Sequence, residues 1–162
     1  MKPWTDEVAH RTYGEHEGSS HPVSLILGIE ADTDEHSDSF WRMGYSYPVQ
    51  LTQWSLASAQ HHPVLDVFLA NFRRRFQSII EDTNELDPLT VNLENIRLEN
   101  ADPLELSGPV AITEAAMAHL SSKTGLRWQA LSGLSDGGRS KLVDDVLILP
   151  ITGFRYVKHS AH

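Results

Sequence analysis

Two acidic side chains follow the first apolar run of the sequence, in the stretch SLILGIEAD that covers residues 24–32. Glu30 and Asp32 are two positions apart, so both side chains point to the same side of an extended strand. Carboxylates placed in this way can bind sugar hydroxyls, hold a metal ion, or act as general acid and base. The alternative is a solvated acidic turn, which the further acids of the loop over residues 31–39 favour.

Two amides and an indole form a second candidate set a short distance along the chain. Gln50, Gln53 and Trp54 lie within five residues of sequence. Amide side chains pair with hydroxyl groups, and an indole ring stacks on the C–H face of a sugar. The alternative is a core tryptophan flanked by surface glutamines.

The segment Ser107-Gly108-Pro109 stands at the start of an expected helix. Free backbone N–H groups at a helix start can bind an anion, whereas the alternative is a helix capped by the Ser107 hydroxyl. The histidines lack the spacing of a metal site, because His61 and His62 are adjacent instead of four positions apart. We expect them to be structural or solvent-exposed.

The apolar patterns predict the elements that must position these residues. Continuous apolar runs predict buried strands over residues 24–29 and 146–150, and Asp144 and Asp145 precede the second. Helices are predicted over residues 49–60, 62–82 and 107–125, with Arg73-Arg74-Arg75 on the wet face of the second. The resulting order is strand, helix, helix, helix, strand, which is an α/β pattern. Two strands are too few for a self-sufficient sheet, so further strands or a larger sheet are expected.

The composition fits one domain and argues against several partners. The chain has 162 residues, 40% of them hydrophobic, and a formal net charge of −9. An acidic balance disfavours binding to nucleic acid and to anionic membrane surfaces. The absence of cysteine excludes disulfides and thiolate metal sites. No apolar run reaches the roughly 18 residues of a membrane span, so we expect no signal or anchor in this chain.

Four motifs in order resemble one protein family. They are LILGIEAD, VQLTQWSLASAQHHPVL, DPLELSGPVAITEAAMAHL and LVDDVLILPITGF. This set is similar to the fungal initiation-specific α-1,6-mannosyltransferases, members of glycosyltransferase family 32 with a DXD sugar-binding motif. The resemblance covers residues 1–154, with a variable part around residues 83–101. It divides the chain into an irregular segment (1–23), the C-terminal part of a glycosyltransferase domain (24–154) and a tail (155–162).

The resemblance implies a fold, an activity and a set of contacts. It implies a partial GT-A fold, which is Rossmann-like, and a divalent cation, usually Mn²⁺. It also implies retaining transfer of mannose from GDP-mannose to an N-glycan or mannan acceptor in the Golgi. The residues implied to bind substrate are Glu30, Asp32, Gln50, Gln53, Trp54, Gly108 and Pro109, with Asp144 and Asp145 supporting them from behind.

The sequence also departs from the family pattern. By this resemblance, the MKPW start would correspond to the segment just after the metal-binding DXD motif, so we expect this chain to lack those aspartates and the earlier strands. His159, in the closing YVKHSAH, is the remaining candidate metal ligand. Without the carboxylates, no cation offsets the charge that develops on the leaving diphosphate. We therefore expect a truncated chain that is inactive alone. The alternative is a non-catalytic carbohydrate-binding or assembly module derived from the same fold.

Overall fold

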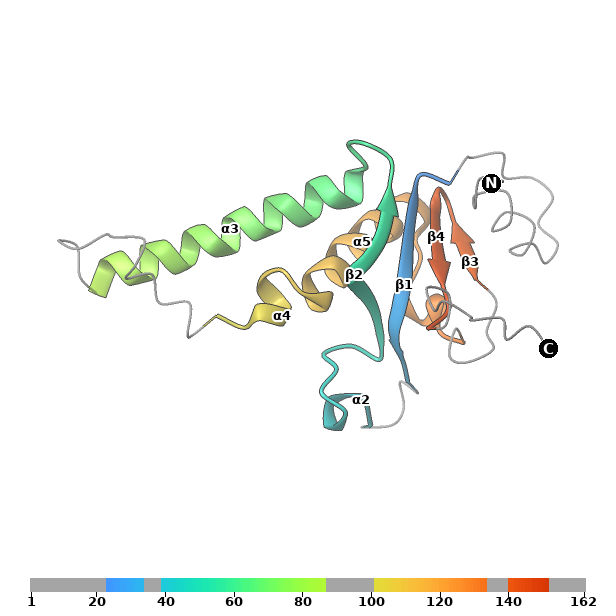
Figure 1. Cartoon of the computed structure of the whole chain (residues 1–162), viewed down its shortest axis with the longest axis horizontal. Helices are drawn as coiled ribbons and strands as arrows, with labels where there is room; N and C mark the ends of the chain where they lie inside the picture. The colour runs from blue at the N-terminus through green and yellow to red at the C-terminus, as the bar shows by residue number, and fades with distance from the viewer. Residues whose placement is uncertain (1–22, 34–38, 87–100, 134–139, 152–162) are drawn as a thin grey trace, which may run out of the picture.

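The computed structural model describes residues 23–33, 39–86, 101–133 and 140–151. The described part is a four-stranded sheet with helices (Figure 1). In chain order the elements are β1 (Leu25–Asp32), α2 (Ser39–Arg42), β2 (Val49–Ser58), α3 (Pro63–Leu86), α4 (Pro103–Leu106), α5 (Pro109–Thr124), the 3-10 turn η3 (Trp128–Leu131), β3 (Lys141–Val143) and β4 (Val146–Leu149). The predicted irregular segment 1–23 and the tail 155–162 lie outside the described residues, apart from Val23.

The sheet has the strand order β2-β1-β4-β3, and β1 occupies an inner position. The two strands predicted from apolar runs are confirmed, and they are direct neighbours. β1 and β4 run parallel in a continuous register from Leu25↔Val146 to Gly28↔Leu149. β2 and β3 pair antiparallel with β1 and β4, respectively. The fold is therefore a mixed α/β structure.

The helix predicted over residues 49–60 is wrong, because this segment forms strand β2. Its helical spacing placed Trp54 inward, but Trp54 is 65% exposed. Four successive residues, 49–52, are buried between the neighbouring strand and α5. Backbone pairing with β1 and burial against a helix override the weak helical pattern of a segment rich in β-branched and small residues.

Strand β3 was not predicted, since three residues carry too little pattern to be recognised. It forms a hairpin with β4 through a turn in which Asp144 has a φ of 54°. Asn and Asp are the non-glycine residues that adopt this left-handed conformation most readily. The two unpredicted strands, β2 and β3, enlarge the sheet to four strands, which confirms the expectation of further strands beyond the two predicted.

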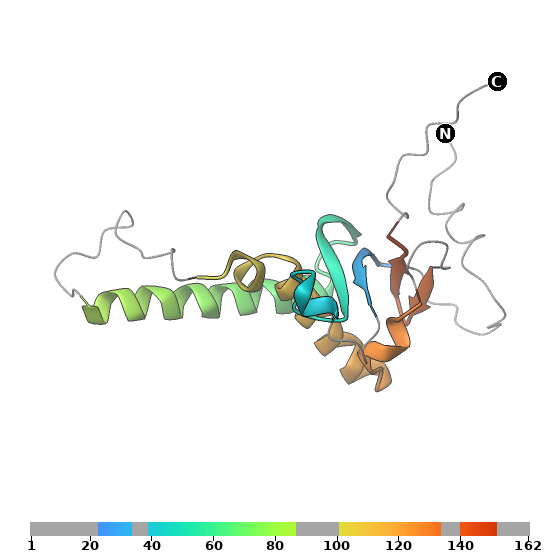
Figure 2. The same ribbon diagram turned by 90° about the horizontal axis from the view of Figure 1, so that it is seen from below.

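One face of the sheet carries the main core, and α5 covers it (Figures 1 and 2). The residues buried there alternate along β1 and β4, as expected for a sheet with distinct faces. The main members are Leu25, Leu27, Ile29, Leu51, Val64, Ile112, Ala115, Ala116, Leu120, Val146 and Ile148. Ile26, Leu147 and Leu149 form a smaller cluster on the opposite face.

The long helix α3 is confirmed, but it does not lie on the sheet along its whole length. Its first turns pack beside α5, and the rest runs away from the strands (Figure 1). Val64 is fully buried, whereas Leu69 on the predicted inward face is 49% exposed. Farther along, the Phe72 and Phe76 rings stack with centroids 5.9 Å apart. Pairing of aromatic side chains one turn apart stabilises the helix locally.

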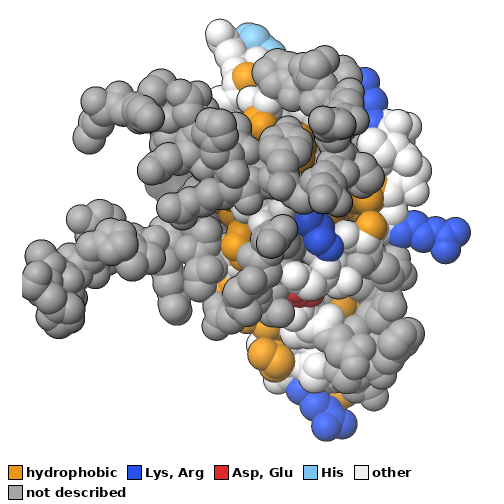
Figure 3. All heavy atoms as spheres, turned by 90° about the vertical axis from the view of Figure 1, so that its right-hand side faces the viewer, with side chains coloured by type: hydrophobic (Ala, Val, Ile, Leu, Met, Phe, Trp, Pro, Cys, Tyr) orange, Lys and Arg blue, Asp and Glu red, His pale blue; other side chains and the backbone are white. Residues whose placement is uncertain are grey.

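The described surface on the side of β3 and β4 does not display the acidic excess of the chain. Figure 3 shows Lys and Arg side chains at several separate places there and little Asp or Glu. The hydrophobic side chains in this view form small groups separated by polar atoms. No helix of the described residues is long and apolar enough to cross a bilayer.

Helices α4 and α5 meet at a tight junction. Ser107 was predicted to cap α5, but it is the C-cap of α4, and Gly108 is the N-cap of α5 without a side-chain hydrogen bond. A Cβ atom on Gly108 would lie 2.7 Å from the Cα of Leu104 and 2.9 Å from its carbonyl oxygen. The close approach of two backbones therefore requires glycine here. The predicted stop at Gly125 is confirmed by its left-handed φ of 68°.

Replacing Gly108 by alanine should destabilise the fold, because the added methyl group meets backbone that cannot rotate away. We expect Gly108→Ala to lower the free energy of unfolding by about 1–3 kcal/mol, the usual range for overpacking. Ser107→Ala is the matched control, since this exposed neighbour acts through its backbone N–H. Urea unfolding measures both. Equal stability of Gly108→Ala and the natural chain would contradict the close approach.

Candidate functional site

A carboxylate held by a buried amide lies at the C-terminal end of β1. Gln50 Nε2 donates a hydrogen bond to Glu30 Oε2 at 2.9 Å, and Gln50 is only 2% exposed. Its other amide atom, Oε1, accepts from the Ser46 backbone N–H at 3.2 Å. Because the amide is bonded at both ends, Gln50 orients Glu30 instead of offering free groups to a ligand.

Asp32 closes the same strand. It pairs with Val49, one position beyond the pairing of Ala31 with Gln50. Strand alternation puts Glu30 and Asp32 on the face opposite to α5. The structure therefore brings together Glu30, Asp32 and Gln50, three of the residues predicted to bind substrate.

Gln53 and Trp54 lie in an irregular part of β2. Between the pairs Leu27↔Leu56 and Ile29↔Leu51, β1 has only residue 28 while β2 has residues 52–55. The Thr52 hydroxyl donates to the Ser55 carbonyl at 3.1 Å across this bulge. Trp54 is exposed on it, and Gln53 Oε1 is buried without a hydrogen-bond partner among the described residues. Such bulges are common beside active sites, where they redirect side chains.

Gly108 and Pro109 are both buried at the start of α5. The Thr113 hydroxyl donates to the Pro109 carbonyl at 2.7 Å and accepts from the Leu51 backbone N–H at 2.8 Å. The first turn of α5 is thereby joined to β2 directly after Gln50. Anion binding at this helix start remains a prediction.

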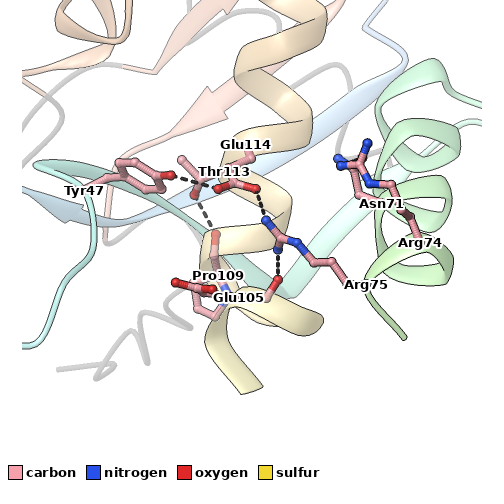
Figure 4. A network of polar contacts seen from close by, with 8 residues as sticks. All are labelled: Tyr47, Asn71, Arg74, Arg75, Glu105, Pro109, Thr113 and Glu114. Atoms are coloured by element: carbon pink, nitrogen blue, oxygen red, sulfur yellow. Dashed lines mark hydrogen bonds and ion pairs between the residues drawn. The ribbon is translucent and has the colours of Figure 1, made fainter. Parts of the chain in front are cut away.

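A network of polar contacts that was not predicted joins four elements or their flanks (Figure 4). Arg75 of α3 forms an ion pair with Glu114 of α5 at 2.7 Å and also donates to the Glu105 carbonyl of α4. Tyr47, just before β2, donates to the other Glu114 oxygen at 2.9 Å. Burial and the hydrogen bond to Glu114 raise the pKa of Tyr47. Of the three adjacent arginines predicted to be on the wet face, Arg75 is therefore bonded to the body of the protein.

A separate polar cluster, formed by Ser24, His62, His119 and Asp145, lies at the N-terminal end of β1. The Asp145 carbonyl accepts from the Ser24 and Leu25 backbone N–H groups at 2.9 and 3.3 Å. The Ser24 hydroxyl donates to Asp145 Oδ2, and His62 Nε2 lies 3.2 Å from the same oxygen. Asp145 and the adjacent Asp144 are therefore at the opposite end of β1 from Glu30.

The protonation of this cluster follows from its contacts. His62 Nδ1 accepts from the Val64 backbone N–H at 3.2 Å, so the proton of a neutral imidazole is on Nε2 and points to Asp145. Partial burial alone would raise the pKa of Asp145, but the hydrogen bond from Ser24 and the contact with His62 outweigh it and lower the pKa. His119 stands edge-on to His62, with ring centroids 5.5 Å apart.

His62, His119 and Asp145 each place one potential metal-ligand atom within 4.8 Å of the others. This group was missed by the sequence reasoning, which treated the histidines as structural or exposed. Imidazole nitrogen and carboxylate oxygen together are a ligand set used by zinc and other divalent transition metals. At the Glu30 end, the described residues form no group of three such ligands. His159, the other predicted ligand, lies outside the described residues.

The chain is a relative of fungal mannosyltransferases. It is 32% identical over 136 residues to the initiation-specific alpha-1,6-mannosyltransferase of Schizosaccharomyces pombe, covering 82% of this chain and 29% of that protein. Its identity to the protein of the same name in Candida albicans is 25% over 146 residues, covering 80% of this chain and 34% of the relative. The chain is thus homologous to part of these mannosyltransferases and spans about a third of their length, which confirms the resemblance of the motifs. No family model and no solved structure matches it.

The contacts of Asp145 predict a specific acid sensitivity. A lowered pKa contributes stability above the unfolded-state value, near 3.8, that is lost as the pH falls through the folded-state value. We expect Asp145→Asn to have a lower free energy of unfolding than the natural chain at pH 7. This difference in free energy should become smaller below about pH 4. Urea unfolding over a pH series measures it.

The control is Asp144→Asn, which removes the neighbouring carboxylate and keeps a residue that tolerates positive φ. The same urea series on this variant shows how much of the change comes from losing a carboxylate in the turn without losing the contacts of Asp145. Ser24→Ala, which removes one donor to Asp145, gives the same test if Asp145→Asn does not fold. If the stability difference from the natural chain does not change with pH for either Asp145→Asn or Ser24→Ala, the ionisation of Asp145 in the folded chain is contradicted.

Glu114 should be energetically coupled to Tyr47, which shares its carboxylate with Arg75. The Arg75 and Glu114 side chains are 29% and 33% exposed, so solvent weakens the pair. We expect Glu114→Gln to cost about 1 kcal/mol, and a double-mutant cycle with Tyr47→Phe to show coupling of a few tenths of a kcal/mol. Glu81→Gln, an exposed site on α3, should change little. Strict additivity of Glu114→Gln and Tyr47→Phe would refute the coupling.

Proposed function

We propose that this chain forms the sugar-contacting part of a mannosyltransferase domain of partial GT-A type, covering residues 24–154. The substrates proposed are GDP-mannose as donor and an N-glycan or mannan chain as acceptor, in the Golgi. The observation that carries the proposal is the oriented Glu30 carboxylate at the C-terminal end of β1, within a segment homologous to α-1,6-mannosyltransferases. Ligands of open α/β sheets bind at this end of the strands.

The chemistry of the residues supports sugar contacts. Carboxylates accept hydrogen bonds from pairs of sugar hydroxyls, and Gln50 holds Glu30 in one orientation so that little freedom is lost on binding. Asp32 would extend the same row of acceptors. The exposed Trp54 would stack on an apolar sugar face, with Gln53 beside it.

Gly108 and Pro109 have a different role in this proposal. Both are buried, and the Pro109 carbonyl is bonded to Thr113. They would place the first turn of α5 behind the sugar-binding strand ends, because Thr113 also holds the Leu51 backbone. Asp144 and Asp145, at the other end of β1, would act only by holding that strand in place.

The described residues do not supply the charge neutralisation that transfer of a nucleotide-activated sugar requires. A leaving diphosphate needs a cation or basic groups near its oxygens. The described carboxylates near Glu30 form no group of three potential ligands, so they do not fit a tightly held Mn²⁺. This favours a second candidate, in which the chain binds carbohydrate without transferring it.

Sugar binding can be tested with an α-1,6-linked mannobiose probe in saturation-transfer and titration NMR. We expect the 162-residue chain to bind it without added metal, and Glu30→Gln and Trp54→Ala each to weaken binding about tenfold, which corresponds to about 1.4 kcal/mol. Trp41→Ala is the matched control, because Trp41 is also exposed, at 57%, but lies on α2.

Absence of binding, or equal binding by all variants, would refute the site. The same sample with GDP-mannose and acceptor separates the two candidates. Formation of a mannosylated product identifies a transferase, and binding without product identifies a binding module.

A further inference from the structure

The cluster at the N-terminal end of β1 draws its side chains from three separate parts of the chain. His62 precedes α3, His119 lies on α5, and Asp145 ends the turn between β3 and β4. The three ligand atoms lie within 4.8 Å of one another, and both histidines are buried. This cluster takes no part in the proposed sugar contacts, which lie at the other end of β1.

Two atoms of the cluster lack hydrogen-bond partners. His119 Nε2 and Asp145 Oδ1 are buried, and neither has a partner among the described residues. His119 is only 8% exposed, so water does not reach its ring freely. A buried polar atom without a partner costs about 1–3 kcal/mol, and such atoms are rare in native proteins. A bound group that satisfies both atoms at once would remove this cost.

The contacts of His62 indicate which atoms are available to that group. Its Nδ1 accepts from the Val64 N–H, so its Nε2 carries a proton and donates to Asp145 Oδ2. Binding a metal through this Nε2 would require moving the proton to Nδ1, against the Val64 N–H. His62 therefore suits the outer position, in which an imidazole holds a ligating carboxylate in place. Oδ2 of Asp145 already accepts hydrogen bonds from Ser24 and His62, so Oδ1 is the carboxylate atom available to a ligand.

We propose that His119 Nε2 and Asp145 Oδ1 bind a divalent transition-metal cation of the zinc type, with water completing the coordination and His62 holding Asp145. Imidazole nitrogen and carboxylate oxygen are common zinc ligands, and the site needs both in their unprotonated forms.

The consequence of such a site is structural. The cation would join α5 to the turn that starts β4, and so fasten the helix layer to the parallel strand pair. Because the cation binds only the folded chain, it raises stability by mass action. The chain has nine histidines, so the test must identify this site by difference between variants.

The experiment is a titration of the metal-free 162-residue chain with ZnCl₂, followed by calorimetry and by ¹⁵N shifts of the histidine rings. We expect one site that moves the His119 Nε2 resonance by tens of ppm, leaves His62 Nδ1 unchanged, and raises the thermal unfolding midpoint by a few degrees. His119→Ala should abolish this site. His62→Asn, which can still cap α3, should weaken it about 10–100-fold.

His61→Asn is the matched control, since it removes an adjacent exposed imidazole at a positive φ that asparagine tolerates. It should bind zinc like the natural chain. The proposal is overturned if His119→Ala binds zinc as tightly as the natural chain, which would indicate adventitious binding to other histidines. It is also overturned if no zinc binds, in which case a buried water satisfies the two atoms. Equal movement of His62 Nε2 and His119 Nε2 would overturn the outer role of His62.

Discussion

The parallel pairing of β1 with β4 is the constraint on which the other contacts depend. It joins parts of the chain that are far apart, since Ser24 and Asp145 are 121 positions apart. Parallel neighbours cannot be joined by a tight turn, so the intervening chain must cross over the sheet. Here it forms β2 on the other edge of β1 and α5 across the main core. The Glu30–Gln50 pair and the His62–His119–Asp145 cluster lie at the two ends of β1, the strand that these neighbours enclose.

The central pair could be predicted because its apolar runs are continuous. A strand buried on both faces reads as LILGI or VLIL, without the polar alternation of a surface strand. Helix α5 was recognised from its flanking proline and glycine. Strand β2 was not, because the large apolar residues of its second half, Trp54 and Leu56, are exposed and its pairing with β1 is interrupted by a bulge. Its strand conformation is a consequence of pairing with β1, which a local pattern does not contain.

The groups at the two ends of β1 also differ in how far local sequence predicts them. Glu30 and Asp32 were recognisable because strand position alone places them together, and Gln50 is only 20 positions from Glu30. His62, His119 and Asp145 carry no spacing rule, since they meet only after α3, α5 and the β3–β4 turn have packed. Local metal motifs rest on ligands one helical turn apart. A site assembled from three distant segments leaves no such pattern in the sequence.

The two ends of β1 nevertheless use one physical arrangement. At each end a backbone N–H determines which way a planar side chain faces, and that side chain then donates to a carboxylate. The Ser46 N–H directs Gln50 toward Glu30, and the Val64 N–H directs His62 toward Asp145. The donors are buried, at 2% and 3% exposure, so each carboxylate is held by a rigid partner. An amide donor such as that of Gln50 orients a carboxylate without cancelling its charge, as preorganised binding requires. The arrangement therefore presents an oriented acid at each end of the same strand, with different neighbours: Gln50 beside Glu30, and the buried His119 ring close to Asp145.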